Sequence, residues 1–453
     1  MLLPVVDQPQ VEVYAVRWYI LALFSALTFV QAALWITFSG ILDVTVQFYN
    51  TTPAMMNWLL AIGNLWYLLC GPGMMWAFGA MRSPVKKMTL MAAFMCTVGS
   101  LVRCLSFLDP KAGWAMWVVA IGQSFISIAG PPVLIGPTKI SLRWFPPEQR
   151  TLSTAISSTA NSLGAGVGFL IAPYLTASFG IRMYLIIEAA CTAFLFILLL
   201  IYFPDSPPLP PSISAQSDAG TSDEYQGPST QEPESFAAFL SNSLQVLRNR
   251  SCLLIIFVGG WITGLMGSWQ GMFDFFFESI FDSFFAGWMG FLFTLSSFIG
   301  ASVGGYIGDT YFKFRYKSIT IGTLTLTLLF SVLFTLCFPN FFYPHSIIPP
   351  SKALVGVLTS GIGVFYGIAY PIFYEFSAEL TYPLSPELSS GLYTWWMNLF
   401  GIIVLGLGTV IPGSAINTMT LVGVFVSILP LFFVKEEYRR AKVDYAGTDV
   451  VVN

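Results

Sequence analysis

The segment Pro204-Asp205-Ser206-Pro207-Pro208-Leu209-Pro210-Pro211 opens the longest polar stretch of the chain, which stays rich in Ser, Gln, Asp and Glu until Arg248. This stretch has too little apolar surface to pack, so we predict a disordered linker over residues 204–250. Six runs of about 20 mostly apolar residues lie on each side of it, and each is long enough to cross a bilayer as a helix. The twelve runs cover approximately residues 18–39, 55–79, 89–108, 113–138, 151–175, 182–203, 251–273, 285–308, 318–338, 353–378, 389–411 and 414–434.

The composition agrees with a protein that lies mostly in lipid. Only 9% of the 453 residues are charged and 55% are hydrophobic, whereas soluble proteins carry about 25% charged residues. The net charge is −3 without a basic block, so we expect no nucleic-acid partner. The six cysteines form no CxxC pair and His345 is the only histidine, so we expect no metal site and no cofactor. The sequence also offers no Ser/His/Asp constellation, and we expect the protein not to be an enzyme.

The distribution of positive charge predicts the orientation. If the N-terminus is cytoplasmic, sixteen Lys and Arg residues lie on the cytoplasmic side and three on the other side. Both termini are therefore predicted to be cytoplasmic. Asn50-Thr51-Thr52 is then a glycosylation sequon on the opposite side, whereas the sequon at Asn249 is cytoplasmic and should stay unmodified. The expected organisation is a cytoplasmic tail (1–17), a six-helix half (18–203), the linker (204–250), a second six-helix half (251–434) and a cytoplasmic tail (435–453).

The two halves show weak internal symmetry. Gly164-x-Gly166-x-Gly168 followed by Pro173 in the fifth run is matched by Gly406-x-Gly408 followed by Pro412 in the eleventh. Closely spaced glycines let helix backbones approach, and interrupted helices at matching positions indicate a site between two halves. The alternative is that Gly and Pro are simply common in membrane helices. Together with the six-plus-six layout, the pattern predicts an all-α membrane protein with the major facilitator fold: twelve transmembrane helices in two six-helix halves.

A few ionisable residues inside these runs are candidates for gating or coupling, because charge in a membrane is costly. Arg103 lies within the third run, where it either forms a buried ion pair or takes part in coupling. Asp274, four residues before Glu278, is expected at the edge of a solvated vestibule. Glu375 and Glu379 share one helix face, and either pair with basic loops such as Lys313–Lys317 to lock a gate or exchange a proton.

Aromatic and amide side chains supply the candidate substrate site. Gln31 and Trp35 are four residues apart and therefore lie on one helix face. Other candidates are Trp269 and Gln270 in the seventh run, Tyr370 in the tenth and Asn398 in the eleventh. Such a set suits a flat heteroaromatic ring by stacking or an organic cation by cation–π attraction. For each residue taken singly, aromatic core packing is the alternative.

Two motifs resemble a known family. The sequences IGPTKISLRWFPPEQR at 135–150 and YEFSAELTYP at 374–383 are similar to those of the solute carrier 49 family, and the similarity extends over about residues 14–434. The resemblance implies a transporter of a small organic nutrient. A lysosomal member with the greatest likeness is regarded as a proton-driven pyridoxine exporter, and other members move choline and have been linked to haem.

The resemblance also implies roles for individual residues. Trp35 matches a tryptophan that packs on choline, Gln31 and Asn398 match pocket amides, and Asp309 matches a loop aspartate of the family. Gly130 stands where the family has a pocket amide, and an acidic dileucine lysosomal signal is missing. We therefore expect a monomeric secondary transporter in the lipid bilayer, with a pyridoxine-like substrate and protons as the coupling ion. The alternatives are a choline, organic-cation or haem transporter and a non-transporting receptor, and the lysosomal or the plasma membrane is the expected location.

Overall fold

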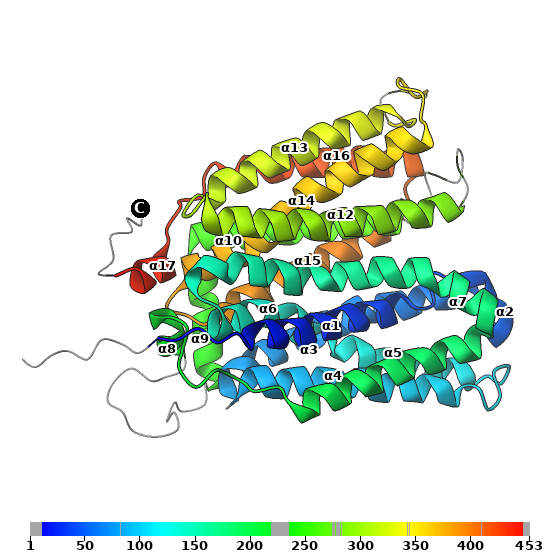
Figure 1. Cartoon of the computed structure of the whole chain (residues 1–453). Helices are drawn as coiled ribbons and strands as arrows, with labels where there is room; N and C mark the ends of the chain where they lie inside the picture. Colours follow the sequence, from blue (N-terminus) through cyan, green and yellow to red (C-terminus); the bar gives the residue numbers. More distant parts are fainter. Residues whose placement is uncertain are drawn as a thin grey trace, which may run out of the picture.

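The computed structural model describes residues 11–446 except 82, 219–234, 274–276, 278–280, 282, 342, 344 and 409, and this part of the chain contains helices and no strand (Figure 1). The long helices are α1 (Arg17–Ile36), α3 (Pro53–Ala80), α4 (Pro84–Leu105), α5 (Ala115–Ile128), α6 (Gly130–Trp144), α7 (Arg150–Ile201), α10 (Arg250–Gly271), α12 (Ser283–Thr310), α13 (Tyr316–Leu336), α14 (Lys352–Thr381), α15 (Pro386–Gly408) and α16 (Gly413–Leu431). Shorter elements are α2 (Leu42–Tyr49), η1 (Pro147–Gln149), α8 (Ile213–Asp218), α9 (Phe236–Arg248) and α17 (Arg439–Asp444).

These helices provide twelve crossings. Ten helices of the described chain are long and apolar enough to span a bilayer, with α5 and α6 counted as one. α7 has 52 residues, which is far more than the roughly 20 that one crossing needs. Gly180 divides it, because its φ of 78° is outside the helical region. α3 adds a crossing of 28 residues without a charged side chain. The predicted all-α fold of two six-helix halves is therefore confirmed.

Buried apolar clusters fill the bundle, one of them with residues of both halves, and glycines set how closely some helices pack. A Cβ at Gly164 of α7 would lie 2.0 Å from the carbonyl oxygen of Phe29 in α1, so only glycine permits this approach. In the matching run of α15, a Cβ at Gly406 would have no atom within 4 Å, whereas one at Gly408 would lie 2.2 Å from the sulfur of Met272. Each run therefore contains a glycine at a close contact, with helix backbone at Gly164 and with a side chain at Gly408.

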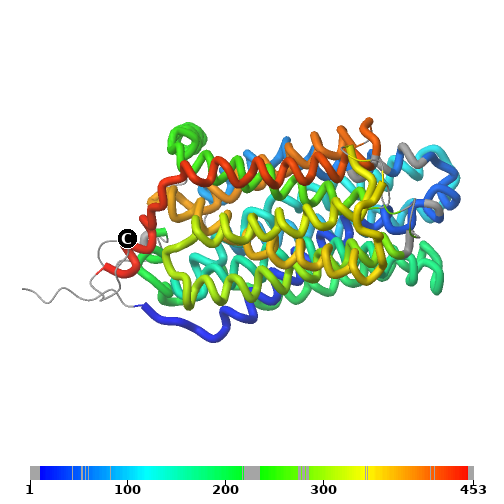
Figure 2. Tube along the Cα trace, turned by 90° about the horizontal axis from the view of Figure 1, so that it is seen from above, coloured from blue at the N-terminus to red at the C-terminus, as the bar shows by residue number. Residues whose placement is uncertain are grey.

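The first and the last residues that the structure describes lie at one end of the bundle, called the terminal end here, and α2 lies at the opposite end (Figures 1 and 2). Asn50 follows α2 and is exposed. Asn249, by contrast, is engaged at the terminal end, where its side chain caps α10 and donates a hydrogen bond to the carbonyl of Leu380.

The predicted disorder of the linker is wrong for the two parts that the structure describes. Residues 204–218 lie against the terminal end, where Asp218 forms ion pairs with Lys139 (2.7 Å) and Arg143 (3.1 Å). Residues 235–250 contain α9 and lead directly into α10. The expectation considered apolar surface alone, whereas the first of these parts is held by charged and hydroxyl groups.

Candidate functional site

A cavity of about 360 Å³ lies between the halves and is lined by residues of α1, α3, α5, α6, α7, α10, α12, α14 and α15. Its lining begins near Leu134 and Tyr370 in the middle of the bundle and continues toward the α2 end, past Ser39 and Leu405. No Asp, Glu, Lys or Arg is among the described residues that line it. The described part of the lining therefore offers hydrogen bonds and aromatic surface.

One wall of the cavity is built around amides. Gln31 is 6% exposed and donates from Nε2 to the carbonyl of Ile126 (3.2 Å). Its Oε1 accepts a hydrogen bond from Nδ2 of Asn161 (3.1 Å), which also donates to the carbonyl of Thr28 (2.9 Å). Asn161 was not predicted, although it lies three residues before the glycine at which α7 meets α1. This network fixes the position of both amides against α1.

Trp35 lies one helical turn beyond Gln31 and also lines the cavity. Its indole is placed by Gly63 of α3, because a Cβ at that glycine would lie 2.1 Å from the indole Nε1. The predicted pair of an amide and a tryptophan on one face of α1 therefore does lie at the cavity wall. Its contact with a substrate stays a prediction.

The opposite wall and the floor come from the second half. Asn398 lines the cavity and donates from Nδ2 to the carbonyl of Thr394 (2.8 Å). Tyr370 contributes its ring, with its hydroxyl 3.4 Å from that of Tyr374. Gln270 also lines the cavity, where it donates to the carbonyl of Gly290 (3.1 Å). These three predicted residues therefore share one cavity with Gln31 and Trp35.

The prediction for Trp269 is wrong. This residue is 2% exposed and is not part of the cavity lining. Its Nε1 donates to Oδ1 of Asn417 in α16 (3.1 Å), and its ring packs edge-on against Phe273 and Phe334. The hydrogen bond to α16 turns the indole into the core of the second half.

Below the cavity, contacts between the halves close the terminal end. The hydroxyl of Tyr67 in α3 lies 2.5 Å from that of Thr394 in α15. One level further, Lys139 of α6 forms a 3.1 Å ion pair with Glu387 of α15, and both side chains are nearly buried. Asp309 of α12 accepts hydrogen bonds from two backbone amides in the first turn of α7, at 3.2 and 3.0 Å. Asp309 therefore caps a helix of the opposite half.

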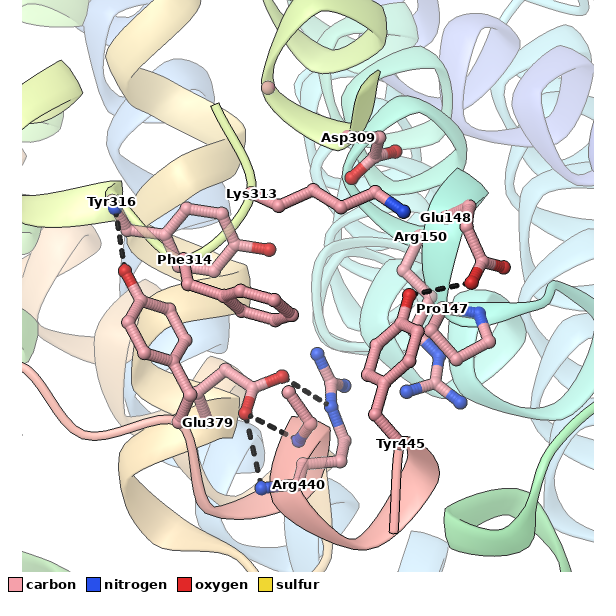
Figure 3. Close-up of a pocket in the computed structure, with 13 residues that line it drawn as sticks. Pro147, Glu148, Arg150, Asp309, Lys313, Phe314, Tyr316, Glu379, Arg440 and Tyr445 are labelled. Atoms are coloured by element: carbon pink, nitrogen blue, oxygen red, sulfur yellow. Dashed lines mark hydrogen bonds and ion pairs between the residues drawn. The ribbon is translucent and has the colours of Figure 1, made fainter. Parts of the chain in front are cut away.

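Glu375 and Glu379 form the centre of this closure, but not with the predicted partner. Both pair with Arg440 of α17 rather than with the Lys313–Lys317 loop: Nη2 donates to Glu375 (2.6 Å) and Nε to Glu379 (3.0 Å). The backbone amides of Arg440 and Ala441 also donate to Glu379, each at 3.1 Å (Figure 3). Burial lowers the pKa of the Arg440 guanidinium, but the two carboxylates outweigh this and raise that pKa above its usual value. The arginine is therefore charged whenever the cluster is closed.

The segment around α17 connects both halves. Asp444 forms a 2.6 Å ion pair with Arg150 at the start of α7 and accepts hydrogen bonds from Ser214 of the linker. Burial raises the pKa of the Asp444 carboxyl, but the Arg150 charge and the Ser214 hydrogen bonds hold it below its usual value. One residue further, the hydroxyl of Tyr445 donates to Glu148 (2.6 Å; Figure 3). What was predicted to be a tail is thus bound to both halves as far as the structure describes it.

Comparison with known proteins identifies the architecture. A family model described as Major Facilitator Superfamily matches residues 23–405. The chain belongs to this superfamily. Its members are transporters and not enzymes, and the chain is a multi-pass membrane protein. Among solved structures, the transporter FucP in the outward conformation has a TM-score of 0.65 at 13% identity, covering 92% of this chain and 98% of FucP. At this identity the likeness supports the major facilitator fold alone.

Relatives within the superfamily indicate which of its families the chain resembles. Solute carrier family 49 member A3 of Xenopus tropicalis is 28% identical, covering 88% of this chain and 78% of the relative. Solute carrier family 49 member 4 homolog of the same frog is 26% identical, covering 96% and 94%. Choline/ethanolamine transporter FLVCR1 of Mus musculus is 26% identical, covering 96% and 78%. These matches confirm the resemblance to solute carrier family 49.

Arg103 joins helices of the first half of this superfamily fold. Its guanidinium lies 3.7 Å from the carboxylate of Glu188 in α7 and donates to the carbonyl of Leu34 in α1 (2.9 Å) and to Gln123 of α5. Gln123 in turn donates to the backbone carbonyl of Trp35 (3.2 Å). Of the two alternatives considered for Arg103, this arrangement agrees with the buried ion pair. A role of Arg103 in coupling stays a prediction. Asp274, the remaining gating candidate, lies outside the described residues.

Proposed function

We propose that this chain is a secondary active transporter of a small organic solute with a flat heteroaromatic ring, of the pyridoxine type, and that it works as a monomer. The observation that carries this proposal is a cavity between the halves whose described lining has no charged side chain and includes Trp35, Tyr370 and several amides. Aromatic faces stack on a planar ring, while amides can hydrogen-bond its hydroxyl groups and ring nitrogen. A site for an obligately anionic solute would be expected to include a basic side chain.

Transport would follow from alternating access of this cavity to the two sides of the membrane. In the structure the cavity extends toward the α2 end, while contacts between the halves, including Lys139 with Glu387 and Arg150 with Asp444, close the terminal end. With both termini cytoplasmic, this state takes up solute from the non-cytoplasmic side of either the lysosomal or the plasma membrane. Opening the terminal end requires the contacts that join the halves, such as Lys139 with Glu387 and Arg150 with Asp444, to break, and rotation of one half against the other then releases the solute.

Choline or a similar organic cation is the second candidate. Several relatives are named choline/ethanolamine transporters, and an indole such as that of Trp35 attracts a quaternary ammonium without a carboxylate. Haem is less well supported, because the single histidine, His345, is exposed outside the cavity lining and offers no iron ligand there.

Uptake into proteoliposomes tests the proposal. Labelled pyridoxine and choline are compared for the wild type, for Trp35→Ala, and for Trp117→Ala, which removes an indole that is 66% exposed on the outer surface of the bundle. We expect pyridoxine to accumulate, Trp35→Ala to raise KM several-fold, and Trp117→Ala to leave uptake unchanged. An imposed proton gradient should increase accumulation if protons are the coupling ion.

Three results would overturn parts of this proposal. Accumulation of choline alone would replace the first substrate class by the second. Binding without accumulation in sealed vesicles would identify a receptor instead of a transporter. Wild-type uptake by Trp35→Ala would show that the cavity wall of α1 does not contact the solute.

A further inference from the structure

Helix α9 (Phe236–Arg248) differs in direction from the long helices of the bundle. In Figure 1 it runs across the bundle axis at the terminal end, and in Figure 2, after a rotation of 90°, it is seen nearly end-on at the edge of the bundle. The two views together place it beside the bundle with its axis across the crossing helices. In a membrane this direction corresponds to the plane of the bilayer surface.

The apolar side chains of α9 cover more of its circumference than the bundle buries. Phe239 and Val246 are 5% and 2% exposed and belong to an apolar cluster that contains residues of both halves. Phe236, Leu240 and Leu244 are 54%, 47% and 54% exposed. Because they are spaced by four residues, they form one stripe along the helix, next to the buried side. Exposure of this stripe to water would be unfavourable, because each apolar side chain would lose the free energy that it gains on transfer from water to an apolar environment.

The third side of α9 is polar. Ser241, Gln245 and Arg248 are exposed and follow one another at intervals of four and three residues. The helix therefore has one side against the bundle, one apolar exposed side and one polar exposed side. A helix at a lipid–water interface that is also packed against a protein needs this division into three.

The apolar stripe continues a lipid-facing surface of the neighbouring helix. The ring of Phe236 lies edge-on against Trp76 of α3, with centroids 5.9 Å apart. Leu69, seven residues before Trp76 and therefore on the same side of α3, is 64% exposed. Leu65, one turn further toward the α2 end, is 47% exposed. The row from Leu65 to Phe236 runs from the middle of a crossing helix to its terminal end without a charged residue.

We propose that α9 is an interfacial anchor that binds the lipid bilayer at the terminal end. Phe236, Leu240 and Leu244 enter the boundary of the acyl chains, and Ser241 and Gln245 stay in the headgroup region. The exposed Arg248 and Arg250 at the junction with α10 attract anionic headgroups. Since α9 touches α3 of the first half and leads into α10 of the second, it fixes the linker to the membrane where the halves meet. The proposal depends on the membrane-spanning fold and not on the identity of the substrate.

Quenching by brominated lipids tests this anchor in the full-length protein. An environment-sensitive fluorescent amino acid is introduced at position 240 in one variant and at position 241 in a matched variant, and each is reconstituted in phosphatidylcholine vesicles with brominated acyl chains. We expect quenching at position 240 to be several-fold stronger than at position 241, and aqueous iodide to show the reverse order. Both sites are exposed, so neither substitution disturbs the core, and retained thermal stability confirms folding.

Anionic lipid provides the second measurement. Addition of phosphatidylserine should increase lipid quenching at position 240, and the double substitution Arg248→Gln and Arg250→Gln should abolish this increase without changing quenching in phosphatidylcholine. Equal quenching at positions 240 and 241, or stronger quenching of position 240 by iodide than by the brominated chains, would overturn the proposal. An increase with phosphatidylserine that survives the double substitution would overturn the role of the arginines.

Discussion

Arg440→Met should unlock the terminal end. The substitution removes a side chain that is 2% exposed and leaves Glu375 and Glu379, which are 0% and 4% exposed, without their cation. Removal of one partner from a buried ion pair costs about 3–5 kcal/mol. At about 1.4 kcal/mol for each factor of ten, the state in which α17 is bound to α14 should lose two to four orders of magnitude in relative population, and the terminal end then loses the bridge that Asp444 of α17 makes to Arg150 of the first half. Methionine keeps much of the buried apolar stem, so the change reports mainly on charge.

Arg439→Met provides the control for this prediction. Arg439 is the neighbouring residue and also pairs with a glutamate, Glu437 (2.8 Å), but the two side chains are 47% and 46% exposed. A pair in such a position contributes about 0–1 kcal/mol. The control should therefore leave the closed state nearly unchanged, although it removes the same charge from the same helix.

Two measurements read out the effect. The distance between spin labels on the two halves at the terminal end reports whether that end is open, and thermal unfolding in detergent reports stability. We expect Arg440→Met to lengthen the distance and lower the unfolding midpoint, and we expect Glu375→Gln with Glu379→Gln in the same background to restore part of both, since amides do not need a cation. Indistinguishable results for Arg440→Met and Arg439→Met would refute the role of the cluster. A triple variant that is less stable than Arg440→Met alone would refute the electrostatic explanation.

Three further predictions concern other parts of the molecule. Gly63→Ala places a methyl group where the Trp35 indole now lies, so it should raise the KM for uptake several-fold, whereas Gly73→Ala on the same helix, with nothing within 4 Å, should not. Because the pKa of Asp444 is held below its usual value, its contribution to stability is complete above the unfolded pKa of about 3.9 and is lost as pH falls through the folded pKa. The loss of stability on acidification below about pH 4 should therefore be smaller in Asp444→Asn, as measured by thermal unfolding against pH. Asn50 should carry a glycan that Asn50→Gln removes, seen as a loss of the mass shift on deglycosylation, and an unmodified Asn50 would contradict the predicted orientation.

The fold was predictable because the physical signal is local. A run of apolar residues long enough to cross a bilayer shows itself in the sequence, and the expected run 353–378 differs from α14 only at its ends. The pairing of Gln31 with Trp35 was predictable for the same reason, since residues four apart on one helix share a face. Both inferences use residues that are close together in the sequence, so neither required knowledge of a contact between distant parts of the chain.

The missed contacts join residues that are far apart in the chain. Arg440 follows Glu375 by 65 residues, and nothing in the sequence of a predicted tail marks one of its arginines as buried. Asn161 contacts Gln31 across 130 residues. Trp269 failed for a different reason: α10 is apolar on all sides, so helical periodicity cannot tell which side faces the cavity. Its hydrogen bond with Asn417, 148 residues away, decides the orientation.

The placement of charge separates substrate recognition from conformational control. The cavity holds no formal charge among its described residues, whereas ion pairs such as Lys139 with Glu387 and Arg150 with Asp444 join the halves at the terminal end. A closed pair loses hydration, and this loss cancels much of its Coulomb attraction. When the terminal end opens, water hydrates both charges again. Opening therefore costs much less than the removal of one partner from such a pair, which leaves the other charge buried in the closed state without water and without a counterion. Ion pairs between the halves can thus close the terminal end firmly and still release it during transport.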